Sequence, residues 1–261
     1  MIFNFSLVSV EQVQPWGEAN DKSLSWFGLT DGQYWIEVGN KKLFEYSDSF
    51  LQKQGGTRYC DYQIARLYED ILTITPYALE TIPDFLVPYI SGRTGSDWAI
   101  KYRSWREKKH PSLSEDEFWR IAELAYSWVG ERVLDSLYLM QGPRILIWSN
   151  SEGINIEWNN KDKSFEGNPL WTASEGCFRI SKENFINEVR SFHNSLMQQM
   201  NARVKSVLKG AVSKDIRIDF DNLVREQEIR SMPIEKIFSG QKVGTDWTEV
   251  MKSIRYIEEN V

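Results

Sequence analysis

The strongest pattern in the chain is a series of apolar residues at helical spacing between Ser181 and Gly210. Serine is preferred immediately before a helix, and glycine is preferred just after one because it tolerates a positive φ. We therefore predict one long helix between these two residues, with an apolar stripe that packs against another layer of the fold. The stripe consists of Phe185, Val189, Phe192, Leu196, Met200, Val204 and Val207.

The N-terminal part of the chain has the two-residue period of half-buried strands instead. Residues 3–7 alternate between apolar and polar side chains. The apolar segments 34–38 and 43–46 flank Gly39 and Asn40, and such a turn-forming pair between two apolar runs is typical of a hairpin. The sequence therefore predicts a β-rich N-terminal section.

A second β section is expected after residue 142. Residues 145–148 are apolar on both faces, which predicts a central strand. Residues 154–158 alternate, which predicts an antiparallel strand with one buried face. Residues 171–173 and 177–180 are suited to complete a meander with these two strands.

A capping box predicts where another helix begins. Ser114 and Glu117 have the spacing at which each side chain bonds to the backbone of the other residue. The apolar face that follows continues through Val133, and glycine and proline come after residue 141. We therefore expect this helix to stop near residue 140.

Together these patterns predict an α+β fold, in which antiparallel hairpin and meander sections pack against segregated helices. Because composition hardly shifts along the chain, we expect a single integrated domain over residues 1–261. Residues 1–58 form its N-terminal β section and residues 59–141 its helical section. Residues 142–180 form the second β section and residues 181–261 the C-terminal helices.

Composition and charge exclude several classes of protein. An aromatic content of 13% supplies a large core, which argues against a disordered chain. A net charge of -6 gives no reason to expect nucleic acid or an anionic membrane as a partner. Cys60 and Cys177 are the only cysteines, and no stretch resembles a signal peptide or a membrane span. We therefore expect a cytoplasmic protein with reduced thiols.

The sequence offers no strong catalytic motif. His110 precedes a proline at a predicted helix end, and His193 lies at the edge of the long apolar stripe, so both have simple structural roles. Nucleophile elbows, Walker loops, dinucleotide-binding glycines and His/Cys metal patterns are all missing from the sequence. We predict no cofactor and no metal. If the chain is an enzyme, Glu157, Glu188 and His193 are the groups expected to carry catalysis.

One acidic pair has the spacing of a metal-binding motif. Asp219 and Asp221 stand at the start of a helix expected over residues 219–231, and a further helix is expected over 246–259. Carboxylate oxygens at that spacing can hold a divalent cation. Capping of the helix by Asp219, with Asp221 in the first turn, explains the pair without a metal.

A basic cluster is expected on a short helix, interrupted by one acid, Glu107. Interleaved aromatic residues are typical of nucleic-acid binding. However, Trp98, Tyr102 and Trp105 share one helical face, so core contacts explain them better. Nucleic acid is therefore an unlikely partner for this cluster, and an acidic protein is an equally good candidate. The cluster consists of Lys101, Arg103, Arg106, Lys108 and Lys109.

Several tryptophans lie near predicted turns, where an indole often anchors a partner protein. For each one alone, burial in the core is the simpler interpretation. Taken together, the hairpin at Trp26 and Trp35 and the tip of the second β section, with Trp158 and Trp171, are the contact surface that we predict. Asp31 lies in the same hairpin region, although a turn explains it more simply.

The motif W-F-G-L-T-D-G at residues 26–32, followed by Tyr34-Trp35 and Leu43-Phe44, resembles an uncharacterised bacterial family of about this length. The resemblance implies a bacterial, cytoplasmic, full-length single-domain protein, and it implies no catalytic residues. Later segments that look similar to this family are 142–144, 154–158 and 185–193.

The leading hypothesis for function is a non-enzymatic protein-binding module, such as an immunity or antitoxin-like protein with one protein partner, expected to be small and basic. The sequence leaves the oligomeric state open. The alternative is a hydrolase that uses carboxylates and a histidine. This alternative predicts that Glu157, Glu188 and His193 meet in one cleft. A nucleic-acid-binding module, the third hypothesis, predicts that Arg103 and Arg106 lie on an open groove outside ion pairs.

Overall fold

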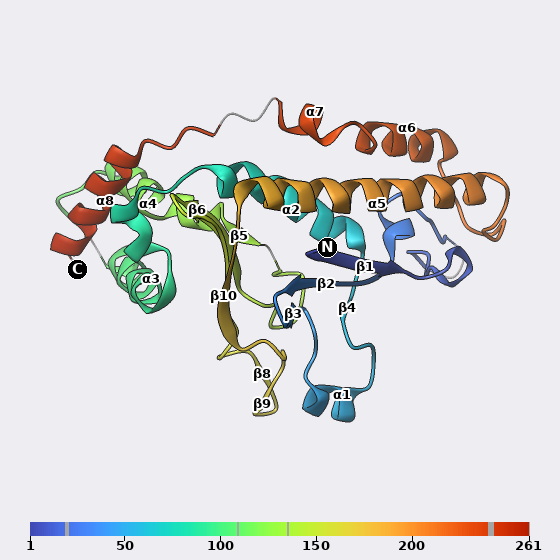
Figure 1. The fold of residues 1–261 in the computed structure, drawn as a ribbon, viewed down its shortest axis with the longest axis horizontal. Helices are drawn as coiled ribbons and strands as arrows, with labels where there is room; N and C mark the ends of the chain where they lie inside the picture. The colour runs from blue at the N-terminus through green and yellow to red at the C-terminus, as the bar shows by residue number, and fades with distance from the viewer. Residues whose placement is uncertain (19–20, 109, 135, 240–242, 261) are drawn as a thin grey trace.

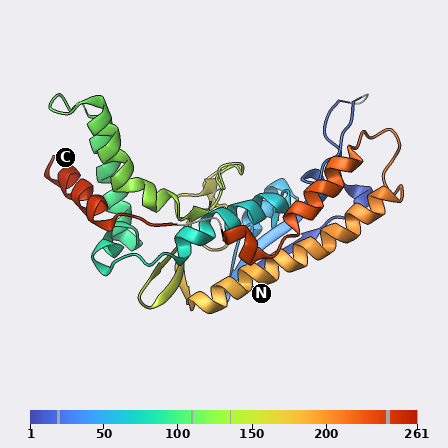
Figure 2. The same cartoon turned by 90° about the horizontal axis from the view of Figure 1, so that it is seen from above.

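The computed structural model describes residues 1–18, 21–108, 110–134, 136–239 and 243–260. Antiparallel sheets near the middle of the molecule are flanked by helices at both ends (Figure 1). This arrangement confirms the α+β class. Seen from above, the long helix α5 and the α3–α4 region diverge as two arms from the sheets (Figure 2).

The first sheet is built from β1 (Phe3–Leu7), β2 (Gly32–Val38), β3 (Lys41–Leu43) and β4 (Cys60–Asp61). Its order is β1-β2-β3, and β4 also pairs with β2. The predicted strand and hairpin are therefore confirmed. The section is less purely β than predicted, because the helix α1 (Asp48–Gln54) follows the hairpin. The short 3-10 helices are η1 (Val10–Gln12), η2 (Gly28–Thr30) and, later in the chain, η3 (Asp84–Tyr89).

The second sheet has the order β10-β7-β6-β5. It consists of β5 (Val133–Leu134), β6 (Ile145–Asn150), β7 (Gly153–Asn159) and β10 (Glu175–Ile180). The meander is confirmed for residues 145–148, 154–158 and 177–180, and β6 is an inner strand as its uniformly apolar sequence indicates. Residues 171–173 are not part of it, because Trp171 forms only an isolated bridge with Tyr46 near the first sheet. Between β7 and β10 lies a small hairpin of β8 (Ser164–Phe165) and β9 (Asn168–Pro169).

The remaining elements are helices, and they include the predicted long helix. They are α2 (Ile64–Leu79), α3 (Gly92–Glu107), α4 (Glu115–Gly130), α5 (Lys182–Leu208), α6 (Phe220–Arg230), α7 (Ile234–Phe238) and α8 (Trp247–Glu259).

Helix α5 is bounded by the two signals that predict it. The Ser181 hydroxyl accepts a hydrogen bond from the Asn184 backbone N–H. At the other end Gly210 has a φ of 91°, its N–H bonds to the Val207 carbonyl, and the Ala211 N–H bonds to the Ser206 carbonyl. These two bonds form a Schellman motif, which satisfies carbonyls left over at a helix end. All seven residues of the predicted stripe are buried.

Helix α4 begins with the predicted capping box of Ser114 and Glu117 but ends ten residues before the predicted stop. The prediction of helix through Val133 is wrong, because Val133 pairs with Leu146 as part of β5. The buried Arg132 side chain explains the early end. Its guanidinium donates to the Trp128 carbonyl at 2.6 Å, which satisfies the last turn, and pairs with Glu80 at 2.7 Å.

The second sheet lies between two hydrophobic clusters, so both of its faces are covered. Ile147 and Ile156 point into the first cluster, with α2, α5 and the first sheet. Leu146 and Trp148 point into the second, with α3, α4 and α8. The prediction that β7 has a single buried face is therefore corrected, because Asn155 is 1% exposed.

Candidate functional site

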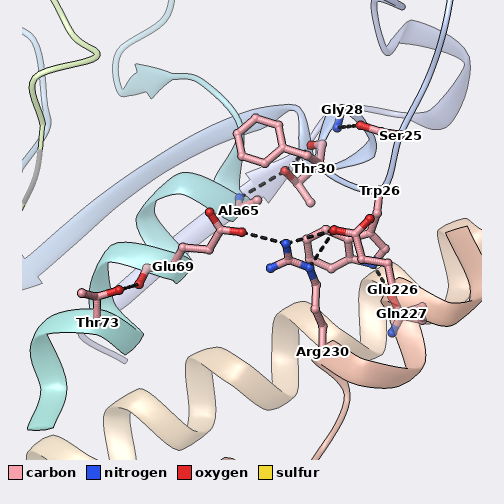
Figure 3. Close-up of polar contacts among 11 residues, drawn as sticks. Ser25, Trp26, Gly28, Thr30, Ala65, Glu69, Thr73, Glu226, Gln227 and Arg230 are labelled. Atoms are coloured by element: carbon pink, nitrogen blue, oxygen red, sulfur yellow. Dashed lines mark hydrogen bonds and ion pairs between the residues drawn. The ribbon is translucent and has the colours of Figure 1, made fainter. Parts of the chain in front are cut away.

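Trp26, the first residue of the sequence motif at 26–32, is fully buried and tied to the C-terminal half of the chain. Its indole N–H donates to the side-chain carbonyl of Gln227 at 2.7 Å. Gln227 is itself buried on α6, and its amide also bonds to Ser231 and to the Met197 carbonyl. Figure 3 shows Trp26 and Gln227 side by side, and the contacts of Gln227 fix the motif against α6 and α5.

Arg230 completes this arrangement with two carboxylates. Its guanidinium lies 4.3 Å from the centre of the Trp26 ring. It also pairs with Glu69 of α2 at 2.7 Å and with Glu226 of α6 at 3.0 Å (Figure 3). The contact between Glu226 and Arg230, four residues apart on α6, is thus part of a larger group rather than an isolated surface pair. We call Trp26, Gln227, Arg230, Glu69 and Glu226 the Trp26 network.

Hydrogen bonds within the motif and to α2 and the N-terminal segment hold the rest of the motif in place. The Thr30 hydroxyl donates to the Phe27 carbonyl at 2.7 Å and accepts from the Ala65 N–H at 3.1 Å, which caps the start of α2. The half-buried Asp31 follows η2, and its backbone carbonyl accepts from the Val8 N–H. The motif therefore joins the N-terminal sheet to α2, in keeping with the interpretation of Asp31 as a turn residue.

Most of the predicted contact surface is buried. Trp26, Trp158 and Trp171 are each at most 5% exposed, so their expected place at the surface is corrected. Trp158 lies under Gly176, where a Cβ atom would meet its ring at 2.3 Å. The Trp171 indole N–H donates to the Gln141 carbonyl. Trp35 is half-buried and stacks on Tyr59 with ring centroids 4.2 Å apart.

The groups expected to catalyse hydrolysis have separate partners and do not meet. Glu188 accepts from the Ile2 N–H at 2.5 Å. His193 is buried, and its Nδ1 lies 2.9 Å from the Tyr68 hydroxyl. Burial lowers the pKa of His193, and the nearby carboxylate of Glu235 partly offsets this shift. Glu157 faces the start of α3, on the opposite side of the second sheet. The convergence that the hydrolase hypothesis requires is therefore not formed.

The other minor candidates have structural roles. Asp219 caps α6 by accepting from the Asn222 N–H at 2.9 Å, so capping explains the Asp219–Asp221 pair. His110 contacts the Trp105 carbonyl at 2.7 Å at the end of α3. Cys60 and Cys177 are unpaired. Among the described residues, no three His, Cys, Asp or Glu side chains are grouped to hold a metal ion.

The basic cluster presents a different surface, because its members Lys101, Arg103 and Arg106 lie on α3 beside α4, and Lys108 follows at the end of that helix. Tyr102 of α3 stacks on Tyr126 of α4 with ring centroids 4.5 Å apart and an interplanar angle of 9°. The Arg106 guanidinium lies over both Tyr102 and Trp119, at 5.8 and 5.7 Å from the ring centres. With Arg103, these residues form what we call the α3–α4 face.

A concavity of about 420 Å³ opens on the α3–α4 face between Arg103, Arg106 and the two stacked tyrosines. Among the described residues, Glu107 is the one acid that lines it. Arg103 and Arg106 are exposed, and neither forms an ion pair with any carboxylate in the described part of the chain. Trp119 is 50% exposed and Ile100 is 64% exposed beside them. Lys109 lies outside the described residues.

Sequence patterns predict the α3 half of this face but miss the α4 half. Trp98 and Trp105 are buried, as their shared helical face predicts. The sequence does not predict that Trp119 and Tyr126 lie near Arg106 and Tyr102, because these residues approach one another only when α3 and α4 pack side by side. Their seven-residue spacing on one helix is the feature from which a shared surface can be inferred.

These features define an α+β protein with a sheet shared by two cores, a buried motif and one exposed basic–aromatic surface. The chain belongs to a protein family of unknown function, DUF5984, whose family model matches residues 2–253. Neither a curated protein nor a solved structure matches it. In the part of the chain that the structure describes, no helix has the length and apolar character needed to cross a membrane.

Proposed function

We propose that this protein is a non-enzymatic binding module and that its partner is a protein with an acidic surface that contacts the α3–α4 face. The observation that carries the proposal is the exposed pair Arg103 and Arg106. Both line one concavity and lack a carboxylate partner among the described residues. Unpaired cations beside exposed apolar rings are the features that favour a complementary acidic partner.

The ring arrangement favours a protein over a nucleic acid. Bases bind single-strand proteins by stacking on open aromatic faces. On the α3–α4 face Tyr102 is covered on one side by Tyr126, and Arg106 lies over it as well. Exposed Ile100 and Trp119 suit the apolar core of a protein interface instead.

We propose that the protein has an immunity or antitoxin-like role and acts in a bacterial cytoplasm. Its support is the sequence, a Trp-rich α+β chain with two cysteines and no catalytic motif. The α3–α4 face changes one expectation. A small basic partner does not suit these unpaired arginines, whereas an acidic surface does. The hydrolase alternative lacks support, because its three groups bind separate partners.

The test compares the wild type with an Arg103→Gln, Arg106→Gln double variant. Proteins captured by each from the native host at moderate salt are identified, and the strongest candidate is purified and mixed with both forms. We expect a stoichiometric complex with an acidic protein that the double variant weakens at least about tenfold, the loss expected for charged hydrogen bonds. A Lys53→Gln, Arg58→Gln variant, which changes distant exposed cations, is the matched control.

Two results would overturn the proposal. One is a complex that forms equally well with the double variant. The other is binding of a labelled single-stranded oligonucleotide that depends on Arg103 and Arg106 and falls steeply with salt, which would identify a nucleic-acid interface.

A further inference from the structure

A cavity of about 560 Å³ lies on the other side of the second core, between the second sheet and the first turn of α3. Its volume is in the range of sites that bind small molecules. It is separate from the α3–α4 face, because it is lined by residues from the start of α3 and from β6, β7 and β10.

The sheet register determines which side chains share the floor of this cavity. Leu146, Glu157 and Cys177 are direct neighbours across β6, β7 and β10, so their side chains share one face. Two residues further along the strands, Asn159 lies opposite Glu175 and its N–H bonds to the Arg144 carbonyl. The floor therefore combines an apolar side chain, two acids, a thiol and one guanidinium.

Both acids on this floor already have partners. The Glu157 carboxylate accepts from the Ser91 hydroxyl and from the Gly92 N–H, each at 2.7 Å. Glu175 pairs with Lys161 at 2.5 Å. Glu157 thus supplies the cap that Ser91 does not give to α3, and it occupies that helix end itself.

Arg144 remains without an acid. Its side chain is half-buried and lines the cavity, and no carboxylate within the described residues lies within ion-pair distance of its guanidinium. A half-buried guanidinium favours an anionic partner, because partial desolvation of an unpaired charge is costly. An open cavity beside such a cation has the electrostatics of a site for an anion.

We infer that this cavity binds a small organic molecule that carries an oxyanion, either a carboxylate or a phosphate monoester. The oxyanion pairs with Arg144, whose planar guanidinium can hold two oxygens at once. The apolar part of the molecule lies against Leu146 and Ile90. This site is independent of the binding role proposed for the α3–α4 face.

Cys177 provides a built-in reporter of occupancy. It is exposed on the cavity floor, whereas Cys60 is buried. Partial desolvation on the cavity floor and the neighbouring Glu157 raise the pKa of the Cys177 thiol, which Arg179 partly offsets, so the thiol stays protonated near neutral pH. At alkaline pH its alkylation by iodoacetamide can be followed by mass spectrometry, and a bound molecule should slow that reaction.

The experiment measures the rate of Cys177 alkylation with phenyl phosphate, benzoate and the neutral analogue benzyl alcohol. We expect at least one of the two anions to protect Cys177 with a dissociation constant of about 1 mM or tighter, and benzyl alcohol to give no protection. The stronger of the two anions identifies the oxyanion as phosphate or carboxylate. Absence of protection by both anions at roughly ten times that concentration would overturn the inference.

Variants then locate the binding group. Arg144→Gln should weaken protection about ten- to a hundredfold, and Arg144→Lys should retain part of it, because the charge remains and the paired geometry is lost. Arg103→Gln, which removes an unpaired arginine from the other surface, should leave protection unchanged. Continued resistance of Cys60 to alkylation reports that each variant is folded. Equal protection in wild type and folded Arg144→Gln would show that Arg144 does not hold the anion.

Discussion

The Trp26 network and the α3–α4 face each place an arginine over a tryptophan, and the surroundings of the two pairs differ. In the Trp26 network, Arg230 lies over a fully buried ring, and its side chain is 21% exposed. Glu69 and Glu226 neutralise it, and Gln227 takes the indole N–H. On the α3–α4 face, Arg106 lies over the half-exposed Trp119, and no acid within the described chain pairs with it.

The difference shows that a cation–π contact does not by itself indicate function. Where acids and hydrogen-bond acceptors complete the pair, as around Arg230, every interaction is made within the chain, and the pair joins distant segments. Where the acids are missing, as around Arg106, the cation retains capacity for a partner. The first region should therefore determine stability, and the second should determine binding.

The largest expected effect comes from truncating the two tryptophans. Trp26→Ala should lower the free energy of unfolding by about 3–5 kcal/mol, because it opens a cavity and leaves Gln227 unpaired. Trp119→Ala should change it by about 1 kcal/mol or less, since that ring is half exposed. Urea unfolding followed by far-ultraviolet circular dichroism measures both values. Similar losses in the two variants would contradict the comparison.

A smaller effect isolates the hydrogen bond of Trp26. Trp26 and Trp105 are both fully buried, but in the described structure the Trp105 indole N–H has no acceptor. Each substitution by phenylalanine removes a similar volume. Trp26→Phe also leaves the Gln227 carbonyl unpaired, so it should cost about 1–2 kcal/mol more than Trp105→Phe. Equal costs in urea unfolding would show that the Gln227 contact contributes little.

Local sequence signals predict much of the fold. The Ser114–Glu117 box, the Ser181 cap and Gly210 each act within a few residues, so they can be recognised from neighbouring positions in the sequence. The early end of α4 is different. It depends on Arg132 reaching Glu80, which is 52 residues away in the sequence, and periodicity carries no information about such a contact.

The candidate sites were less predictable for the same reason. Trp26 binds a residue 201 positions away, so its burial cannot be inferred from the turn beside it. The cation cluster on α3 is visible in the sequence, because its residues are close together. The sequence does not show that the Arg144 side chain has no carboxylate partner among the described residues, because this depends on which acids Ser91 and Lys161 bind in the folded chain.

Substitution of Arg230 and of Arg106 should change the free energy of unfolding by different but smaller amounts. Arg230→Gln leaves Glu69 and Glu226 near each other without their shared cation, so it should destabilise the protein by about 1–2 kcal/mol. Arg106→Gln should change stability by about 0.5 kcal/mol or less, because no ion pair is broken. Thermal unfolding at low and at moderate salt measures both. A larger loss of stability for Arg106→Gln would show that Arg106 stabilises the fold as Arg230 does.

The smallest expected effect is the pH dependence of the free energy of unfolding that the buried His193 contributes. Burial lowers its pKa in the folded state, so below its ordinary pKa of about 6.5 the unfolded chain binds more protons than the folded one. The free energy of unfolding should therefore fall as the pH drops below about 6.5, with a slope of at most one proton. His193→Gln, which can still bond to Tyr68, should flatten that slope. An unchanged slope in urea titrations between neutral and mildly acidic pH would mean that other groups control it.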